Sequence, residues 1–384
     1  MFFVDQLSAC VPLLRFFFPK AKVLFYGHFP DRLLAQEGTG LIKHLKILYR
    51  GPFDAIESWS TGCADDVVVN SKFTRTVFRH TFAGMRNRDL KVIYPCVDTE
   101  GGKPSETAKL WPGKAVLLSI NRFEGKKNLG LAIRAYAGLQ PEERARSKLV
   151  VAGGFDIRVH ENAKTLEELQ SLADGLKLKY ATYRGDDNTL DSDEKDIAFL
   201  LSVPDDLKRR LLHTASILVY TPQNEHFGIV PIEAMVAGVP VLSTNSGGPL
   251  ETIYDGRTGW LRSPDKVEQW TDVMRKPLIP SSADSLRTMG EKGRERVLAE
   301  FSHTKMTDSL DQEIQRLCAS TARRPRVIPD WIYALVFCTV IAVLGGIGMT
   351  YFMTYIAVPK AREHDAYMGA RANISTVIVG HEEL

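Results

Sequence analysis

The chain has 384 residues, of which 44% are hydrophobic and 25% are charged, and its formal net charge is +3. This is the composition of a globular protein long enough for two α/β domains and an appendage. The charge is too small to indicate nucleic-acid binding, and no basic run carries interleaved aromatic residues. The five cysteines are scattered without CxxC spacing, so neither a zinc site nor a disulfide framework is predicted.

The N-terminal segment, MFFVDQLSACVPLLRFFFPKAK, has some of the apolar content of a signal sequence. However, Asp5, Pro12 and Arg15 interrupt the apolar run, and no basic region precedes it. We therefore predict a strand or a short helix of a soluble domain here.

Short β-rich runs then alternate with helical patterns such as 128–139. The runs are apolar on both faces and are bounded by polar residues, glycine or proline, which is typical of buried parallel strands. They are residues 21–29, 65–70, 90–95, 115–120, 148–154, 215–220 and 239–244. The alternation predicts an α/β fold built from doubly wound, Rossmann-like units.

Residues 41–50, LIKHLKILYR, have an apolar helical stripe and three basic residues elsewhere. Two interpretations stay open. The segment is an ordinary domain helix with a basic outer face, or it is an amphipathic helix that rests on anionic lipid.

The stretch 98–114 has the glycine, proline and polar content of a linker. It divides the chain into a first segment of about a hundred residues and a second of about two hundred. Ligands of open α/β sheets collect at the carboxyl ends of the strands. The cleft between two such domains is therefore the expected site.

The segment NRFEGKKN follows the strand 115–120 and places Arg122 and Lys127 in a loop at a strand end. Their cationic side chains could neutralise a departing diphosphate. Basic loop residues are more often only solvated, so this signal is weak by itself.

Residues 185–196 form an acidic insertion that contains Asp191 and Asp193 in a DxD pattern. A DxD pattern is a metal-binding signature in some enzymes. Here no buried strand precedes the motif, so we expect a solvated loop and no metal site.

Two carboxylates, Glu225 and Glu233, frame the otherwise apolar run of residues 224–235. Glu225 is expected in the loop after the strand 215–220, and Glu233 about one turn into the next helix. The helix N-terminus favours an anion in the same space. The alternative is that Glu233 only stabilises its helix and Glu225 is an ordinary loop residue.

The turn NSGGPLET follows the strand 239–244 and contains Gly247 and Gly248. Glycine N–H groups can approach phosphate oxygens without obstruction by a Cβ atom. Most GG turns are only turns, but three such segments at strand ends of one domain favour a diphosphate site.

Residues 331–359 contain no charged side chain, whereas a membrane-spanning helix needs about 20 apolar residues. Aromatic residues lie towards both ends, as in an interfacial belt. We predict a transmembrane helix over 331–358, followed by a short tail, 359–384.

These motifs resemble the retaining glycosyltransferases of family 4, which have the GT-B fold. The segments that carry the resemblance are FEGKKN, the two glutamates separated by seven residues, AMVAGVPV and SGGPLE. DQLSACVPLLR and VLFYGHFPD are similar to segments of the GDP-mannose-dependent α-1,3/α-1,6-mannosyltransferases within that family. The similarity covers about residues 4–318.

The resemblance implies a role for each candidate residue. Arg122 and Lys127 would clamp the donor diphosphate. Glu233 would bind the nucleotide ribose, and Glu225 would approach the transferred mannose. His28 would face the acceptor or the mannose across the cleft. The remaining donor-binding positions would be His226, Gly228, Gly247 and Gly248.

The resemblance also implies transfer of mannose from GDP-mannose to a dolichyl-diphosphate oligosaccharide, first α-1,3 and then α-1,6, without a metal or other cofactor. The enzyme would lie in the endoplasmic reticulum membrane, facing the cytosol, with other glycosyltransferases of the pathway as partners. Two alternatives are a family 4 enzyme with a different donor and a catalytically silent, membrane-tethered nucleotide-sugar binder.

The expected domains are a partial acceptor-side domain over 1–105 and a donor domain over 106–320. In the family, a strand and a glycine-rich loop precede the segment that here begins at Asp5. The resemblance therefore implies that about a hundred residues of the first domain are absent, and we expect little or no transferase activity from this chain.

Overall fold

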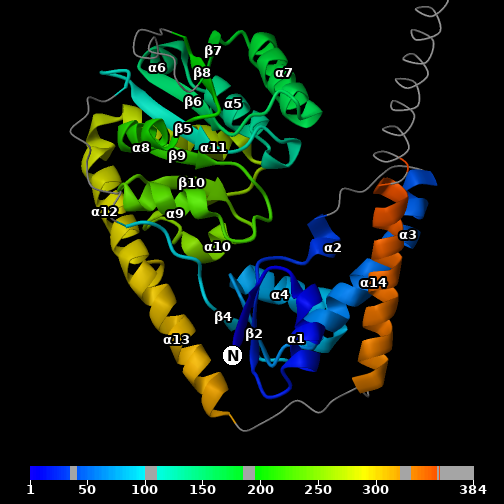
Figure 1. Cartoon of the computed structure of the whole chain (residues 1–384). Coiled ribbons are helices and arrows are strands. Elements are labelled where there is room, and N and C mark those ends of the chain that lie inside the picture. Colours follow the sequence, from blue (N-terminus) through cyan, green and yellow to red (C-terminus); the bar gives the residue numbers. More distant parts are fainter. Residues whose placement is uncertain (35–40, 100–109, 185–194, 321–329, 353, 355–384) are drawn as a thin grey trace, which may run out of the picture. The chain divides into compact units, whose positions relative to one another are not determined.

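The computed structural model describes residues 1–34, 41–99, 110–184, 195–320, 330–352 and 354 (Figure 1). The chain divides into two compact units. The larger unit comprises Met1–Ala9 and Lys22–Thr321, and the smaller one comprises Cys10–Ala21 and Ala322–Leu384. Asp191, Asp193, the tail 359–384 and most of the predicted linker lie outside the described residues.

The larger unit begins with a parallel four-stranded sheet, which we call the first lobe. Its strands, in spatial order, are β1 (Phe2–Asp5), β2 (Val23–Gly27), β3 (Asp66–Val69) and β4 (Lys91–Val92). All five residues of β2 are buried, as expected for an apolar strand between two parallel neighbours. Within residues 1–22, where a strand or a short helix was predicted, the structure has both the strand β1 and a helix, α1 (Val11–Phe17).

The helices α2 (Asp31–Leu34) and α3 (Leu41–Gly62) lie between β2 and β3, and α4 (Lys72–Thr81) lies between β3 and β4. Residues 41–50 form the start of α3, so the predicted helix is present. Their side chains lie outside the described set, and both interpretations of the basic face therefore remain predictions.

A parallel seven-stranded sheet forms the second lobe, with the order β11-β10-β9-β5-β6-β8-β7. Alternate residues of its strands enter two different cores. Val116 and Leu118 of β5 belong to one core, whereas Leu117 belongs to the other. Both faces of the sheet are thus covered, as in a doubly wound fold. The strands are β5 (Ala115–Ile120), β6 (Ser147–Gly153), β7 (Tyr180–Arg184), β8 (Ile197–Leu201), β9 (Ala215–Tyr220), β10 (Val241–Thr244) and β11 (Gly259–Arg262).

Nine helices accompany the described part of this lobe. They are α5 (Gly130–Ala137), α6 (Pro141–Ala145), α7 (His160–Gly175), α8 (Asp205–Thr214), α9 (Ile229–Val236), α10 (Pro249–Thr252), α11 (Val267–Arg275), α12 (Ala283–Glu300) and α13 (His303–Ala319).

The order of strands in the second sheet reverses beside β5. The chain proceeds from β5 to β6 on one side and later returns to β9 on the other. Ligands of doubly wound sheets bind at such a switch point, outside the carboxyl ends of the strands. The segments that follow β5 and β9 are those that carry Lys127 and Glu225.

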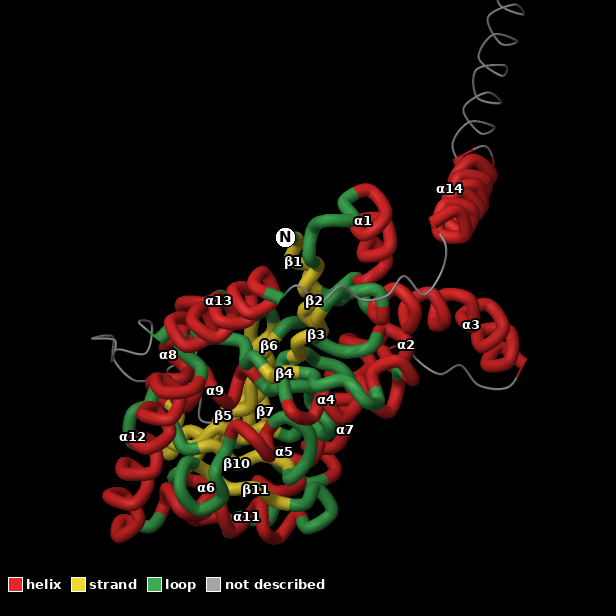
Figure 2. The backbone as a smooth tube through the Cα atoms, turned by 90° about the horizontal axis from the view of Figure 1, so that it is seen from below, coloured by secondary structure: helices red, strands yellow, loops and turns green. Residues whose placement is uncertain are grey.

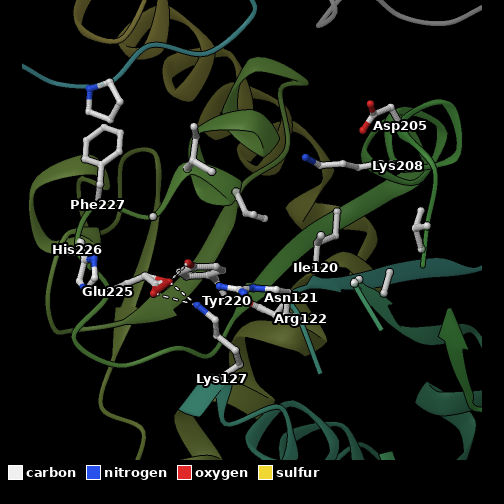
Figure 3. Close-up of a pocket in the computed structure, with 18 of the residues that line it drawn as sticks. Ile120, Asn121, Arg122, Lys127, Asp205, Lys208, Tyr220, Glu225, His226 and Phe227 are labelled. Atoms are coloured by element: carbon white, nitrogen blue, oxygen red, sulfur yellow. Dashed lines mark hydrogen bonds and ion pairs between the residues drawn. The ribbon is translucent and has the colours of Figure 1, made fainter. Parts of the chain in front are cut away.

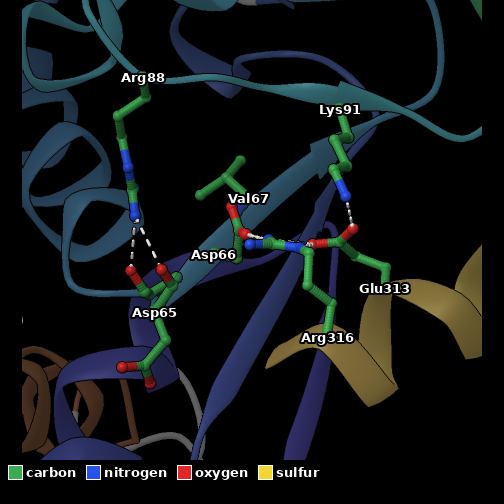
Figure 4. A network of polar contacts seen from close by, with 8 residues as sticks. Asp65, Asp66, Val67, Arg88, Lys91, Glu313 and Arg316 are labelled. Atoms are coloured by element: carbon green, nitrogen blue, oxygen red, sulfur yellow. Dashed lines mark hydrogen bonds and ion pairs between the residues drawn. The ribbon is translucent and has the colours of Figure 1, made fainter. Parts of the chain in front are cut away.

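Helices α12 and α13 follow one another along the outside of the larger unit in both backbone views (Figures 1 and 2). Leu317 of α13 packs with Leu24, Val68 and Ile93 of the first lobe. Beside it, Glu313 is 2% exposed and forms ion pairs with Lys91 and Arg316 (Figure 4). Helix α13 therefore fastens the end of the second lobe to the first sheet.

The two lobes also meet at the N-terminus of α4. The Glu251 carboxylate, from α10, accepts the backbone N–H groups of Lys72 and Phe73 at 2.8 and 3.0 Å. It also accepts the Tyr94 hydroxyl at 3.0 Å. An acid from one lobe thus caps a helix of the other, where free N–H groups and the helix dipole favour negative charge.

We expect Glu251→Ala to lower the free energy of unfolding by about 1.5–3 kcal/mol, the range for hydrogen bonds to a charged group. Urea unfolding of the purified wild-type and variant chains measures this difference in the free energy of unfolding. Glu251→Gln keeps an acceptor and should lose less, and Glu295→Ala, which removes an exposed helical acid, is the control. Equal midpoints for Glu251→Ala and Glu295→Ala would contradict the capping role.

The smaller unit contains α1 (Val11–Phe17) and α14 (Asp330–Phe352), which contact each other. Among the residues that the structure describes, no helix combines the length and the apolar character needed to cross a membrane. The predicted span 331–358 extends past the described part of α14, and it stays a prediction.

Candidate active site

The central feature of the site is a carboxylate held by an ammonium group and a phenol. Lys127 Nζ donates to both oxygens of Glu225, at 3.0 and 2.9 Å. The Tyr220 hydroxyl donates to Glu225 Oε2 at 2.8 Å. Figure 3 shows the Lys127 and Tyr220 side chains converging on this carboxylate. The structure therefore brings together two of the predicted site residues.

Local structure explains why these two side chains meet. Lys127 ends a 3-10 turn, Gly125–Lys127, and Asn128 leaves this turn in a left-handed conformation with φ 49°. Thr221, directly after β9, donates its hydroxyl to the Lys127 carbonyl at 2.7 Å. The loops after β5 and β9 are thereby tied together at the switch point of the sheet.

Burial and charge act in opposite directions on Glu225. Burial works to raise the pKa of Glu225, but the Lys127 ammonium and the hydrogen bonds from Lys127 and Tyr220 outweigh it and hold this pKa below its ordinary value. Burial, followed by the Glu225 charge, raises the pKa of Tyr220 well above its usual range. The pair is thus a fixed carboxylate beside a fixed ammonium, with a neutral phenol as donor.

A cavity of about 590 Å³ opens beside this pair, within the usual size range of small-ligand sites. Asn121 and Arg122, after β5, line it together with Lys208 of α8 (Figure 3). The Arg122 side chain is 65% exposed, whereas that of Lys127 is 11% exposed. His28, His226 and Gly228 also line the cavity, so most predicted residues are gathered around it.

Glu233 lies next to the cavity without lining it. Its Oε1 accepts from Lys208 Nζ at 2.7 Å, and Lys208 does line the cavity. Its Oε2 is buried and has no hydrogen-bond partner among the described residues. Glu233 is the fifth residue of α9, beyond the first turn, so the alternative of a simple first-turn acid is not supported.

Gly247 and Gly248 were expected to shape the loop beside the sugar and phosphates, and the structure places them against the loop that carries Glu225. A Cβ atom on Gly248 would lie 2.4 Å from the Phe227 backbone, and one on Gly247 would lie 2.6 Å from the Glu225 carbonyl oxygen. The N–H of Gly248 donates to that same carbonyl at 2.7 Å. Neither glycine lines the cavity. Because neither glycine has a Cβ atom, the turn can pack directly against the backbone of the loop that carries Glu225. The Gly248 N–H already donates to the Glu225 carbonyl.

His226 is stacked on Phe29 of the first lobe, with ring centroids 3.6 Å apart and an interplanar angle of 5°. Its carbonyl accepts the Ser71 hydroxyl. Burial lowers the pKa of His226 to about 4, an effect that Glu225 opposes and Lys127 reinforces. His226 is therefore neutral at pH 7 and joins the two lobes beside the cavity.

This lowered pKa predicts a pH-dependent stability. His226 has an ordinary pKa of 6.5 when unfolded and about 4 when folded, so the native state binds fewer protons between these values. Its contribution to stability is complete above pH 6.5 and is lost as the pH falls towards 4. Urea midpoints at pH 7, 5.5 and 4.5 should fall less steeply for His226→Phe than for wild type. The exposed His160→Gln should keep the wild-type slope.

Two features of the site were absent from the sequence-based prediction. Lys208 lies in a charged helix, where its residue type carries no signal. Gly153, at the end of β6, lines the cavity, and a Cβ there would lie 1.9 Å from the Asn121 carbonyl oxygen. A glycine directly after the apolar run 149–152 was a usable sign of this close approach.

Among the described residues, no group of three or more His, Cys, Asp or Glu side chains could hold a metal ion. The charged groups around the cavity are instead three cations, Arg122, Lys127 and Lys208, with the carboxylates of Glu225 and Asp205. Such a set can bind a polyanion and accept hydrogen bonds from hydroxyl groups in one ligand.

Comparisons with known proteins agree with this chemistry. The family described as glycosyl transferases group 1 matches residues 192–296. The chain is 45% identical to the α-1,3/1,6-mannosyltransferase alg-2 of Neurospora crassa, over 91% of this chain and 76% of that protein. It is 43% identical to the α-1,3/1,6-mannosyltransferase ALG2 of Debaryomyces hansenii, over 82% and 70% of the two chains.

Solved structures support the fold alone, because their sequences are distant. Sucrose-phosphate synthase from Thermosynechococcus elongatus superposes with a TM-score of 0.64 at 20% identity, covering 83% of this chain and 74% of that one. Anabaena Alr3699/HepE, in complex with UDP and glucose, has a TM-score of 0.60 at 17% identity, covering 82% and 78%. The described lobes therefore have a GT-B-like arrangement.

Proposed function

Because this chain belongs to the family of α-1,3/1,6-mannosyltransferases, we propose that the cavity beside Glu225 is its donor site and that the donor is GDP-mannose. The chain is a glycosyltransferase with a GT-B-like α/β fold. The observation that carries the proposal is the Lys127–Glu225 pair at the switch point of the second sheet.

The donor diphosphate would lie near Arg122 and Lys127. Lys127 is nearly buried, so its charge is weakly screened and acts strongly on a nearby phosphate. Helix α9 begins at the cavity, with Ile229 and Val230 among the lining residues, and its N-terminal dipole favours the same anion. Glu233 lies behind Lys208 at the cavity wall, so a donor ribose that displaced Lys208 would reach its unpaired Oε2, and this hydrogen bond would remove the penalty of a buried, unsatisfied oxygen.

The sugar would lie beside Glu225, whose carboxylate can accept hydrogen bonds from mannose hydroxyl groups. In transfer with retention, the bond between the anomeric carbon and the diphosphate oxygen breaks, and the acceptor oxygen forms the new bond on the same face. The departing diphosphate takes the proton of the acceptor hydroxyl. Arg122 and Lys127 stabilise the negative charge that develops on it.

We propose that these two cations replace a metal ion in the transfer, so no cofactor is needed. Dialysis of the purified chain against EDTA should leave its turnover unchanged. A loss of turnover that added Mg²⁺ or Mn²⁺ restores would contradict this proposal.

The acceptor we propose is a dolichyl-diphosphate oligosaccharide at the cytosolic face of the endoplasmic reticulum, where other transferases of the same pathway would act on the same lipid. Exposed apolar side chains along α14, such as Leu344, Ile347 and Met349, support membrane attachment through this region. Deletion of residues 331–384 should release the protein from microsomes under carbonate extraction. Retention of the shortened chain in the microsomal membrane would contradict attachment through this region.

The deciding experiment is a donor screen with the purified chain and a synthetic lipid acceptor carrying the Man-GlcNAc2 core. GDP-mannose should be used, and UDP-glucose and UDP-N-acetylglucosamine should not. Turnover would also overturn the expectation of little or no activity from this chain. The alternative of a catalytically silent binder is not favoured, since the relatives described above are mannosyltransferases. Tight GDP-mannose binding without any transfer would revive it.

A further inference from the structure

A carboxylate outside the roles described above lies beside His28. Asp5 is the last residue of β1 and is aligned with Tyr26 in the parallel pairing of β1 with β2. His28 follows β2 directly. Asp5 Oδ1 and His28 Nε2 are 2.8 Å apart, a hydrogen-bond distance. The two side chains meet because the carboxyl ends of parallel strands share one edge of a sheet.

The backbone around Asp5 turns sharply. Gln6 has φ 63°, in the left-handed region that non-glycine residues seldom occupy. Its N–H donates to the Tyr26 carbonyl at 3.0 Å, and the Leu7 N–H donates to the Asp5 carbonyl at 2.7 Å. Asp5 is therefore held at the sheet edge by hydrogen bonds on both sides of the turn.

His28 is also held in place. A Cβ atom on Gly27 would lie 2.4 Å from Phe78 Cζ, so the backbone before His28 approaches this buried ring closely. Thr74 donates its hydroxyl to the His28 carbonyl at 3.3 Å. The Tyr26 ring meets the imidazole edge-on, with centroids 5.0 Å apart. The hydrogen bond to Asp5 then fixes the remaining rotation of the imidazole.

This contact determines which nitrogen of His28 carries the proton. An ionised carboxylate can only accept, so His28 Nε2–H is the donor. In the neutral imidazole, Nδ1 is then left as an acceptor. His28 lines the same cavity as Glu225 and His226, so an acceptor at its Nδ1 lies on the side of the proposed donor site.

We propose that Asp5 is a positioning residue for mannosyl transfer, which holds His28 in the Nε2-protonated tautomer and leaves Nδ1 for a substrate hydroxyl. This rests on the proposed function and on the expectation, from the family resemblance, that His28 faces the acceptor or the mannose. Asp5 acts through His28 and does not itself touch the substrate. The alternative is an exposed ion pair without a catalytic effect, since the side chains are 58% and 39% exposed.

Steady-state kinetics of the full chain with GDP-mannose and the lipid acceptor distinguish these alternatives. Asp5→Ala should lower kcat by about 10- to 100-fold, by analogy with the loss of the partner that orients a metal-bound imidazole. The donor KM and the thermal midpoint should stay close to wild type. Asp5→Asn should retain most of the turnover, because its amide oxygen still accepts from Nε2–H. Asp89→Ala, at an exposed acid before β4, is the matched control and should have no effect.

A double-mutant cycle completes the test. If Asp5 acts through His28, Asp5→Ala combined with His28→Ala should be no slower than His28→Ala alone. Two outcomes would overturn this inference and leave the proposed function intact. In one, the losses of kcat from Asp5→Ala and His28→Ala multiply in the double variant. In the other, Asp5→Ala has a wild-type kcat although His28→Ala is impaired. Wild-type turnover of His28→Ala would overturn the inference together with the role of His28.

Discussion

Replacing Lys127 with alanine is expected to lower turnover by at least about a hundredfold, the scale for removing one preorganised electrostatic contact in an active site. Two effects add in this variant. The developing charge on the diphosphate loses a nearly buried cation, and the Glu225 carboxylate loses its ion-pair partner. Because that carboxylate is itself largely buried, its pKa should rise towards or above its ordinary value.

The chain offers a matched control one residue away. Lys126 belongs to the same 3-10 turn, but its side chain is 65% exposed and pairs with Glu124. Lys126→Ala removes the same charge from the same loop and should leave turnover close to wild type. Turnover and the affinity for GDP should be measured for both variants. Equal effects of the two substitutions would show that net charge, and not the position of Lys127, matters.

Glu233→Ala is expected to lower kcat/KM for the donor by at least about a hundredfold, an effect similar in size to that of Lys127→Ala on turnover. The expected cause is different, because Glu233 holds Lys208 through Oε1 and offers Oε2 to the donor ribose. Removing it deletes the ribose acceptor and frees Lys208 from its partner. The loss should therefore include a raised donor KM.

Two further variants separate these contributions. Lys208→Ala removes the same ion pair but keeps the carboxylate, so it should impair donor use less than Glu233→Ala. Glu268→Ala removes an exposed acid from the first turn of α11 and is the control for helix stability. Unchanged donor kinetics in Glu233→Ala would refute the ribose role, whereas a lowered thermal midpoint alone would indicate a structural one.

Periodicity predicted four strands of the seven-stranded sheet, β5, β6, β9 and β10, and missed β7, β8 and β11. The runs 115–120, 148–154 and 215–220 are the buried strands β5, β6 and β9, because strands covered on both faces are continuously apolar. Strand β7 was missed because it lies at the edge of its sheet, where alternate residues face solvent and the apolar run is broken. Strand β8 was missed although its five residues are all buried, since it follows directly after the acidic insertion.

The sequence by itself determined the family, the doubly wound fold and the segments that carry Lys127, Glu225 and Glu233. These depend on local spacing, which a single chain displays directly. Only the tertiary structure decided which side chains meet. The pairing of Lys127 with Glu225 joins residues 98 positions apart, and that of Asp5 with His28 depends on the register of β1 against β2.

The same reason applies to the other site residues. Gly247 and Gly248 were expected to shape the loop beside the sugar and phosphates, and only the structure shows that their close neighbours are the backbone atoms of residues 224–227. Lys208 is an ordinary helical lysine in the sequence and becomes a site residue only because α8 brings it to Glu233. Hydrophobic periodicity determines which faces of helices and strands are buried. Which polar groups lie within hydrogen-bond distance depends on how distant chain segments meet at the edge of a sheet. The local pattern of a single sequence does not show which segments meet.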